Sequence, residues 1–346
     1  MPLSEALSTT CREIARRRGT AHLATAGAVA MLLAGCTAEP PVPEADAPVV
    51  AAVVSETQEL KILDRVSTVV AEADQVDEVR SLAARLSGPA LTMREAELKL
   101  AAARGDSEAL TDLTPQMQQV VLPSDQGWPR SSYGMGVQPQ GRGTPVLVAF
   151  EQASAREQYK LWGYVQLLPS VTMPRFAEAA LGSPAVSADD TSLKVAPATV
   201  IEQYASVLSV DGRSQYADGF ADDDLRRFHR EYGKLQVDAI EEKDGRGSFK
   251  IAYEPTEDPV KAVRTVDGGA LVLGVLASQE TVRAEENWQL GPPTPSARAL
   301  WGDAEQTNVV RIVYRDMVAL YVPPAGASAP ITLVGYHRVP HIVSND

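Results

Sequence analysis

The sequence predicts an α+β protein with two domains of similar layout, residues 57–181 and 193–346, joined by a linker at 182–192. In each half, apolar residues first recur at intervals of three or four, which is typical of amphipathic helices. Short runs rich in valine, leucine and aromatic residues follow, separated by glycine, proline and serine, as in strands and turns. Helices that precede a set of antiparallel strands are typical of the α+β class.

The first half should begin with two helices. Helical spacing of apolar residues runs from Leu63 to Leu86 and again from Met93 to Ala103, with a break at Gly88-Pro89. The change from helical spacing to short apolar runs then predicts strands, and a segment rich in glycine, proline and serine predicts a loop at 123–144. The predicted strands of this half are 120–122, 145–150 and 159–168.

The second half repeats the order of helices followed by strands. Pro197 should open one helix, because proline suits the first turn. Asp222-Asp223-Asp224 should open another, because carboxylates cap free backbone N–H groups and oppose the helix dipole there. Asp267-Gly268-Gly269 predicts a hairpin turn. The predicted strands of this half are 248–253, 263–266, 270–277, 309–322 and 331–339.

This order of elements resembles the cystatin and NTF2-like cones, in which helices pack in the concave side of a curved antiparallel sheet. The resemblance implies that each domain is such a cone. It is carried by element order alone, which many α+β folds share. The two halves are not visibly alike in sequence, so a duplication is a hypothesis about architecture.

Cys36 ends the run Leu33-Ala34-Gly35-Cys36, which has the residue order of a bacterial lipobox. Arginines and a short apolar stretch precede it, as in a signal peptide. The chain therefore resembles bacterial lipoprotein precursors. The resemblance implies a signal peptide at 1–35, cleavage before Cys36, and a lipid anchor on the Cys36 sulfur at the extracytoplasmic face of the cell membrane.

The alternative is that residues 1–36 are an uncleaved membrane span or a buried helix. A span needs about 20 apolar residues in a row, and the stretch before Cys36 is shorter. The export route, general secretory or twin-arginine, stays open. Residues 36–56 are rich in proline and alanine, which predicts an extended tether behind the lipidated cysteine.

Charge and cysteine content exclude several classes of function. The chain carries a net charge of −13, which argues against nucleic acid as a partner, because phosphate binding needs basic surface. Cys11 and Cys36 are the two cysteines. Cys11 would leave with the signal peptide, so the mature chain would have no disulfide, no thiol nucleophile and no cysteine–zinc site.

Two stretches of the second half carry a further resemblance. They are the hairpin Arg264-Thr265-Val266-Asp267-Gly268-Gly269-Ala270-Leu271-Val272 and the strand end Val318-Ala319-Leu320-Tyr321-Val322-Pro323-Pro324. Together with the lipobox, residues 193–346 are similar to an uncharacterised family of actinobacterial lipoproteins with a domain of unknown function. The resemblance implies a cell-envelope lipoprotein and brings no functional residues with it.

The histidines do not form a recognisable metal or catalytic site in the sequence. His337 and His341 have the spacing of zinc ligands on a helix, but Pro340 lies between them and no glutamate completes the motif. His229 is expected to be solvated, since three arginines surround it. No phosphate-binding glycine loop and no G-x-S-x-G nucleophile motif is present. We therefore predict no metal, no cofactor and no catalytic residue.

Trp128 and Tyr133 are the candidate binding residues, because they stand in the polar stretch QGWPRSSYGMG. Exposed aromatic side chains on such a loop can stack on sugars or anchor a protein partner. The alternative is that both residues pin the loop to its own domain.

Three hypotheses for function follow from these features. The favoured one is a non-catalytic binding or envelope-assembly module on the membrane surface, with an envelope protein or a glycan as partner. The first alternative is an envelope enzyme whose pocket is lined from scattered positions, and the second is a structural spacer. A deep pocket with a buried, charge-shifted carboxylate or histidine would favour the enzyme.

Overall fold

The computed structural model describes residues 51–76, 79–114, 116–137, 144–169 and 171–345. These residues lie in one compact unit, Val49–Asp346, which combines helices with an antiparallel sheet and confirms the α+β class. The predicted signal peptide, Cys36 and most of the tether fall outside the described residues. Within the described ranges, no helix is both long enough and apolar enough to cross a membrane.

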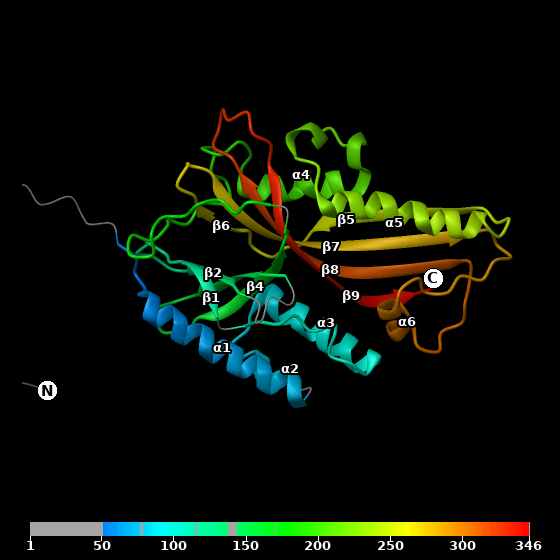
Figure 1. The fold of residues 1–346 in the computed structure, drawn as a ribbon, viewed down its shortest axis with the longest axis horizontal. Coiled ribbons are helices and arrows are strands. Elements are labelled where there is room, and N and C mark those ends of the chain that lie inside the picture. The colour runs from blue at the N-terminus through cyan, green and yellow to red at the C-terminus, as the bar shows by residue number, and fades with distance from the viewer. Residues whose placement is uncertain (1–50, 77–78, 115, 138–143, 170, 346) are drawn as a thin grey trace, which may run out of the picture. The chain divides into compact units, whose positions relative to one another are not determined.

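One sheet contains the strands of both halves of the chain (Figure 1). The described residues form nine strands in the order β1-β2-β3-β4-β9-β8-β7-β5, with β6 paired to β7, and all pairs are antiparallel. The strands of the first half are β1 (Met117–Val121), β2 (Arg130–Gly136), β3 (Val146–Gln152) and β4 (Lys160–Leu167). Those of the second half are β5 (Gly247–Pro255), β6 (Lys261–Arg264), β7 (Ala270–Ala284), β8 (Val309–Val322) and β9 (Thr332–Ser344).

The two halves meet where β4 pairs with β9. Gln166 lies opposite Tyr336, and Leu167 lies opposite Gly335. A side chain at position 335 would clash there, because its Cβ would lie 2.7 Å from the Gln166 carbonyl oxygen. Since strands from both halves hydrogen-bond into one sheet, the predicted division into two domains at 182–192 is not confirmed, and neither is the cone.

The sequence patterns missed strand β2, because its serines and glycines are typical of a loop, and they also missed the short helix at Pro295–Trp301. Strand β2 pairs with β1 on one side and β3 on the other, so its backbone groups are satisfied despite its weak strand propensity. Gly134 lies against Met117, whose Sδ would be 2.8 Å from an added Cβ. Small residues therefore let the neighbouring side chains pack across this strand.

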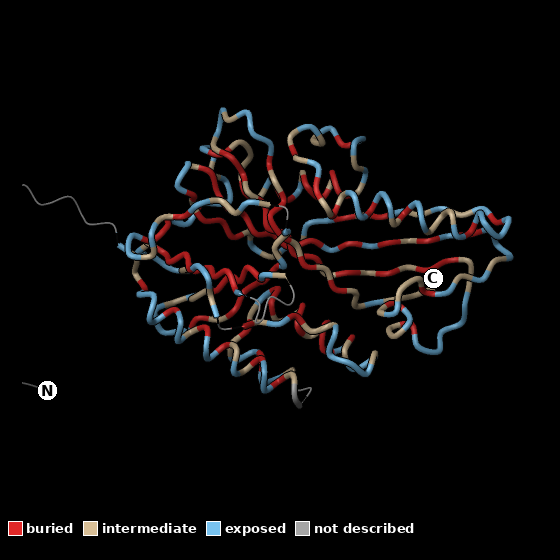
Figure 2. The backbone as a smooth tube through the Cα atoms, in the orientation of Figure 1, coloured by how far each residue is buried: buried red, intermediate tan, exposed pale blue. Residues whose placement is uncertain are grey.

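Helices cover both faces of the sheet (Figure 1). One face carries α1 (Glu56–Val76), α2 (Val79–Leu82) and α3 (Gly88–Arg104), and we call it the α3 face. The other carries α4 (Pro197–Val210) and α5 (Asp224–Glu241), and we call it the α5 face; the short α6 (Pro295–Trp301) packs on β8 and β9. The buried residues in Figure 2 follow the strands and the helix sides that face them.

Local signals placed the starts of α4 and α5 and the hairpin correctly. Pro197 stands at the first position of α4, and Asp223 caps α5 by accepting a hydrogen bond of 2.9 Å from the Arg226 backbone N–H. Between β6 and β7, Gly268 has φ +84°, a conformation that favours glycine. Gly269 is needed for a different reason, because an added Cβ would lie 2.8 Å from the Val322 carbonyl oxygen.

Successive side chains of β9 lie on opposite faces of the sheet, so His337 and Arg338 are on different faces. His337 lies opposite Met317, which belongs to the core of the α3 face. Arg338 lies opposite Asp316, beside residues of the α5 face. The sheet therefore separates two buried polar clusters, one under α3 and one under α5.

Candidate functional site

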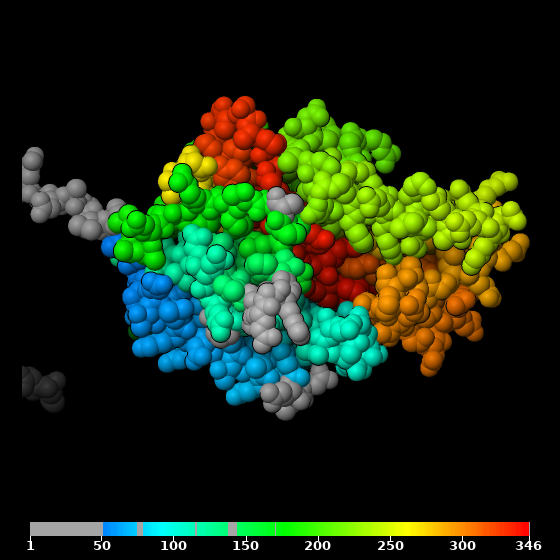
Figure 3. Space-filling view, viewed as in Figure 1, coloured from blue at the N-terminus to red at the C-terminus, as the bar shows by residue number. Residues whose placement is uncertain are grey.

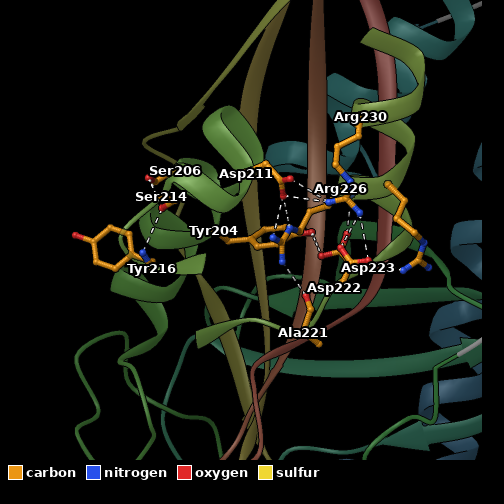
Figure 4. A network of polar contacts seen from close by, with 11 residues as sticks. Tyr204, Ser206, Asp211, Ser214, Tyr216, Ala221, Asp222, Asp223, Arg226 and Arg230 are labelled. Carbon is orange, nitrogen blue, oxygen red and sulfur yellow. Dashed lines mark hydrogen bonds and ion pairs between the residues drawn. The ribbon is translucent and has the colours of Figure 1, made fainter. Parts of the chain in front are cut away.

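The N-terminus of α5 is fixed by a network of polar contacts (Figure 4). The Tyr204 hydroxyl on α4 donates to Asp223 Oδ2 at 3.0 Å. Arg226 donates from Nε to Asp211 Oδ1 at 2.9 Å, and Arg230 binds both Asp211 and Asp222. These contacts join α5 to the end of α4. They hold the inner side of α5 over the sheet.

The same network lines an open groove of about 630 Å³ between α4, α5 and β5. Its charged lining includes Arg226 and Arg230, and both pair with Asp211. These pairs leave Arg226 and Arg230 unavailable to a ligand, although Arg213 and Lys250 also line the groove. The candidate functional site lies on the other side of α5.

A second hollow, of about 290 Å³, lies between α5, the sheet and α6, and we call it the aromatic pocket. In Figure 3, the red residues of β9 are visible in a recess between α5, in yellow-green, and the orange segment that contains α6. Thr294 and Ser296 lie at the α6 side. Aromatic side chains supply much of the wall, namely Phe228, Tyr232, Tyr314 and Tyr336.

The floor of the aromatic pocket is a closed set of charged contacts. Arg338 donates from Nη1 to Glu280 Oε1 at 2.8 Å and from Nε to Asp316 Oδ1 at 3.0 Å. The Tyr314 hydroxyl donates to Glu280 Oε2 at 2.9 Å, and the Arg338 guanidinium lies 3.4 Å from the centre of the Tyr314 ring. Ser278 donates to Asp316 Oδ2 at 2.7 Å.

Burial has the largest effect on the pKa of Asp316 in this cluster. It raises the pKa of Asp316 to about 6, because the effect of desolvation exceeds that of the Arg338 charge and the Ser278 hydrogen bond. Arg338, with 9% of its side chain exposed, stays charged between the two carboxylates. Because the two carboxylates neutralise its charge, this buried arginine is not available to bind an anionic ligand.

Tyr232 presents the unsatisfied polar atom of the pocket wall. Its hydroxyl is buried and has no hydrogen-bond partner among the described residues. Its ring stacks on Phe228, with 5.3 Å between centroids and an interplanar angle of 14°. Phe228 is 44% exposed, so it forms the outer edge of the pocket. A buried hydroxyl without a partner is costly unless something else binds it.

The prediction that His229 is solvated is wrong, because the residue is buried. It is 7% exposed, and its Nε2 lies 2.7 Å from the Tyr253 hydroxyl. Burial and then the Arg338 charge lower its pKa to about 3. The cause is Gly233, which lets α5 approach β5 so closely that an added Cβ would lie 2.6 Å from Phe249. The buried stripe of α5 therefore includes Leu225, His229 and Gly233.

The polar cluster under α3 is structural. Glu97 and Arg94 are buried; Arg94 binds Asp74 and donates to Glu97 at 2.6 Å. Burial would raise the pKa of Glu97, but the contacts with His337 and the Arg94 charge outweigh it and lower that pKa to about 2. His337 Nε2 lies 2.7 Å from Glu97 Oε1. Within the described part of the chain, no group of three or more potential ligands is placed to hold a metal ion.

The structure separates the two residues of the predicted binding loop. Trp128 is 45% exposed, with the Arg130 guanidinium 4.0 Å from its ring centre. Tyr133 is 1% exposed in the middle of β2, opposite Ala149 of β3. Tyr133 is therefore a core residue and cannot stack on a ligand beside Trp128. The expectation for Tyr133 failed because the predicted loop at 123–144 contains the whole of β2.

The pocket residues were missed because they come from five separate elements, α5, α6, β7, β8 and β9. A weak signal was present: Glu280, Asp316 and Arg338 are charged residues inside otherwise apolar strands. Charged groups in such positions are seldom buried unless they are paired. This signal points to a buried cluster, but the sequence does not show which strands lie side by side.

The sheet with helices on both faces and the aromatic pocket define an α+β protein with one sheet shared by both halves of the chain. More particularly, the chain belongs to the DUF8094 family, whose model is described as a domain of unknown function and matches residues 50–340. The match covers both halves, more than the 193–346 of the resemblance found in the sequence. No curated protein and no solved structure matches the chain.

Proposed function

We propose that this protein is a lipoprotein, anchored through Cys36 at the extracytoplasmic face of the bacterial membrane, and that it works as a non-catalytic binding module. The lipobox and the proline-rich tether support the anchor. The observation that carries the binding role is the aromatic pocket, with the buried hydroxyl of Tyr232 unpartnered in its wall. Binding is favoured over catalysis because Arg338 forms ion pairs with both Glu280 and Asp316. These charged groups are therefore not free to act on a substrate.

The pocket geometry favours a small uncharged ring compound as ligand. Its volume of about 290 Å³ is at the lower end of the range for small-molecule sites. Flat aromatic walls suit the face of a sugar or aromatic ring, and the Tyr232 hydroxyl can hydrogen-bond to it. Two carboxylates against one guanidinium in the floor disfavour an anion.

Replacing Tyr232 by phenylalanine should weaken ligand binding without loss of stability. The variant keeps the ring and removes only the hydroxyl, which has no partner among the described residues. One lost hydrogen bond corresponds to a roughly fivefold to tenfold rise in Kd. Ligand-observed NMR with N-acetylglucosamine, methyl glucoside and benzamide finds the probe that binds, and titration then compares the variant with the parent chain.

Tyr159→Phe is the matched control for this experiment. Tyr159 also has a buried hydroxyl without a described partner, but it packs in the core of the α3 face, away from the pocket. Its replacement should leave Kd unchanged. Equal loss in both variants, or no binding by any of the three probes, would count against the aromatic pocket as the binding site.

Replacing Cys36 by alanine should release the protein from the membrane, because the thiol would be the point of lipid attachment. Two acyl chains give stable anchoring, at about 0.8 kcal/mol per buried CH₂ group, and the variant would have none. Membrane fractionation and the intact mass of the processed chain measure the effect. Two results together would disprove the anchor. The Cys36→Ala variant would still pellet with membranes, and the parent chain would lack the mass increment of a lipid.

A further inference from the structure

A cationic groove lies on the α3 face of the sheet, beyond the part that α3 covers. It has a volume of about 320 Å³ and is formed by β5, β7 and β8, whose far ends extend past α3 in Figure 1. Lys250, Arg283 and Arg311 are its charged residues, and the lining contains no carboxylate. Their backbones are paired in the sheet, but within the described residues none of the three side chains forms an ion pair or a hydrogen bond.

The register of the strands places these three cations around Thr281. Lys250 lies opposite Thr281 on one side, and Arg311 lies opposite it on the other. Arg283 is two residues further along β7, on the same face. With neighbouring strands about 4.8 Å apart, the backbones at 250 and 311 are about 10 Å apart. The cations thus form a triangle that one or two repeating units of a polymer can span.

The charge of the groove contrasts with that of the whole chain, which is −13. At physiological salt, charges act over a Debye length of about 8 Å, so an approaching ligand experiences the local cations rather than the net charge. Like charges held together without counterions cost free energy, which an anionic ligand would recover. The guanidinium groups of Arg283 and Arg311 have the fork geometry that binds carboxylates in pairs of hydrogen bonds.

We infer that this cationic groove binds an acidic polysaccharide. Ser248, Thr281 and Gln279 lie among the cations and can hydrogen-bond to sugar hydroxyls. The lining has no aromatic side chain on which nucleic-acid bases could stack. Its one apolar member is Ala252, so it has no side chain to insert into a lipid bilayer. The groove is separate from the aromatic pocket, which lies on the α5 face.

The test is binding of oligogalacturonate, an acidic homopolymer, to the full chain with Cys36→Ala, so that lipid cannot contribute. The groove variant combines Lys250→Ala, Arg283→Ala and Arg311→Ala. The matched control combines Lys61→Ala, Arg65→Ala and Arg80→Ala, exposed positions on α1 and α2 that change the net charge equally. Thermal unfolding of both variants checks that they remain folded.

The groove variant should bind oligogalacturonate about 10- to 30-fold more weakly, since each exposed cation contributes roughly threefold. The control should change Kd by less than about twofold, and a neutral maltooligosaccharide should not bind the parent chain. The inference is overturned by absence of oligogalacturonate binding, or by equal loss in both variants. It is also overturned if phosphatidylglycerol vesicles or single-stranded DNA bind the groove more tightly than the oligosaccharide.

Discussion

Replacing Glu59 by glutamine should stabilise the protein by about 3 kcal/mol at pH 8. Glu59 lies on α1, fully buried, and accepts a hydrogen bond of 2.6 Å from Ser132. Its Oε2 is buried without a partner among the described residues. Burial raises the pKa of Glu59 from 4.5 to about 7, against a smaller opposing effect of the Ser132 hydrogen bond. Ionising this carboxyl therefore costs free energy that a neutral amide avoids.

The sign of the pH dependence follows from that raised pKa. The folded chain binds the Glu59 proton more tightly than the unfolded chain, so this group favours folding below pH 4.5. Its contribution is lost as the pH rises toward and through 7. The advantage of Glu59→Gln should accordingly be small at pH 4.5 and reach its full size at pH 8, as measured by urea unfolding at both values.

Glu72→Gln is the control for this prediction, because Glu72 lies on the same helix but is exposed. It removes the same charge without a buried carboxyl, and its effect on the free energy of unfolding should stay within about 0.5 kcal/mol at both pH values. The measurement compares the gain in free energy of unfolding of Glu59→Gln over the parent chain at the two pH values. If that gain is no larger at pH 8 than at pH 4.5, the Glu59 carboxyl does not ionise at a cost in the folded chain.

Replacing Arg338 by methionine should destabilise the protein by about 3–5 kcal/mol at pH 7. Methionine fills much of the space of the arginine stem, so the loss comes chiefly from charge. Glu280 and Asp316, 1% and 2% exposed, would be left facing each other without a cation. Burial already raises the pKa of Asp316 to about 6, and without Arg338 it should rise further. The variant should therefore recover part of its stability on acidification, when these carboxyls become neutral.

A triple variant separates the charge effect from lost packing. Arg338→Met with Glu280→Gln and Asp316→Asn removes all three charges, and it should regain much of the stability that Arg338→Met loses. Arg315→Met is the matched control, because Arg315 lies on the opposite face of β8 and is half-buried. If Arg338→Met and Arg315→Met destabilise equally in urea unfolding at pH 7, the buried ion-pair cluster contributes no special stability.

The position of α5 shows where sequence reasoning stops. Its start at Asp223 was predictable, because a capping carboxylate acts on backbone N–H groups within one turn. Its buried side was not, because that depends on how closely Gly233 can approach Phe249 of another element. This close approach decides that His229 is buried and that Tyr232 and Phe228 line a pocket.

The sequence by itself determined the α+β class, the Gly268 turn and the starts of α4 and α5, since the turn and the helix starts depend on residues a few positions apart. The tertiary structure decided that β4 pairs with β9, which joins both halves into one sheet. It also decided that Arg338 meets Glu280 under α5, while Lys250, Arg283 and Arg311 meet on the opposite face. Such pairings depend on contacts between distant segments, and local periodicity specifies only which face of a strand is apolar.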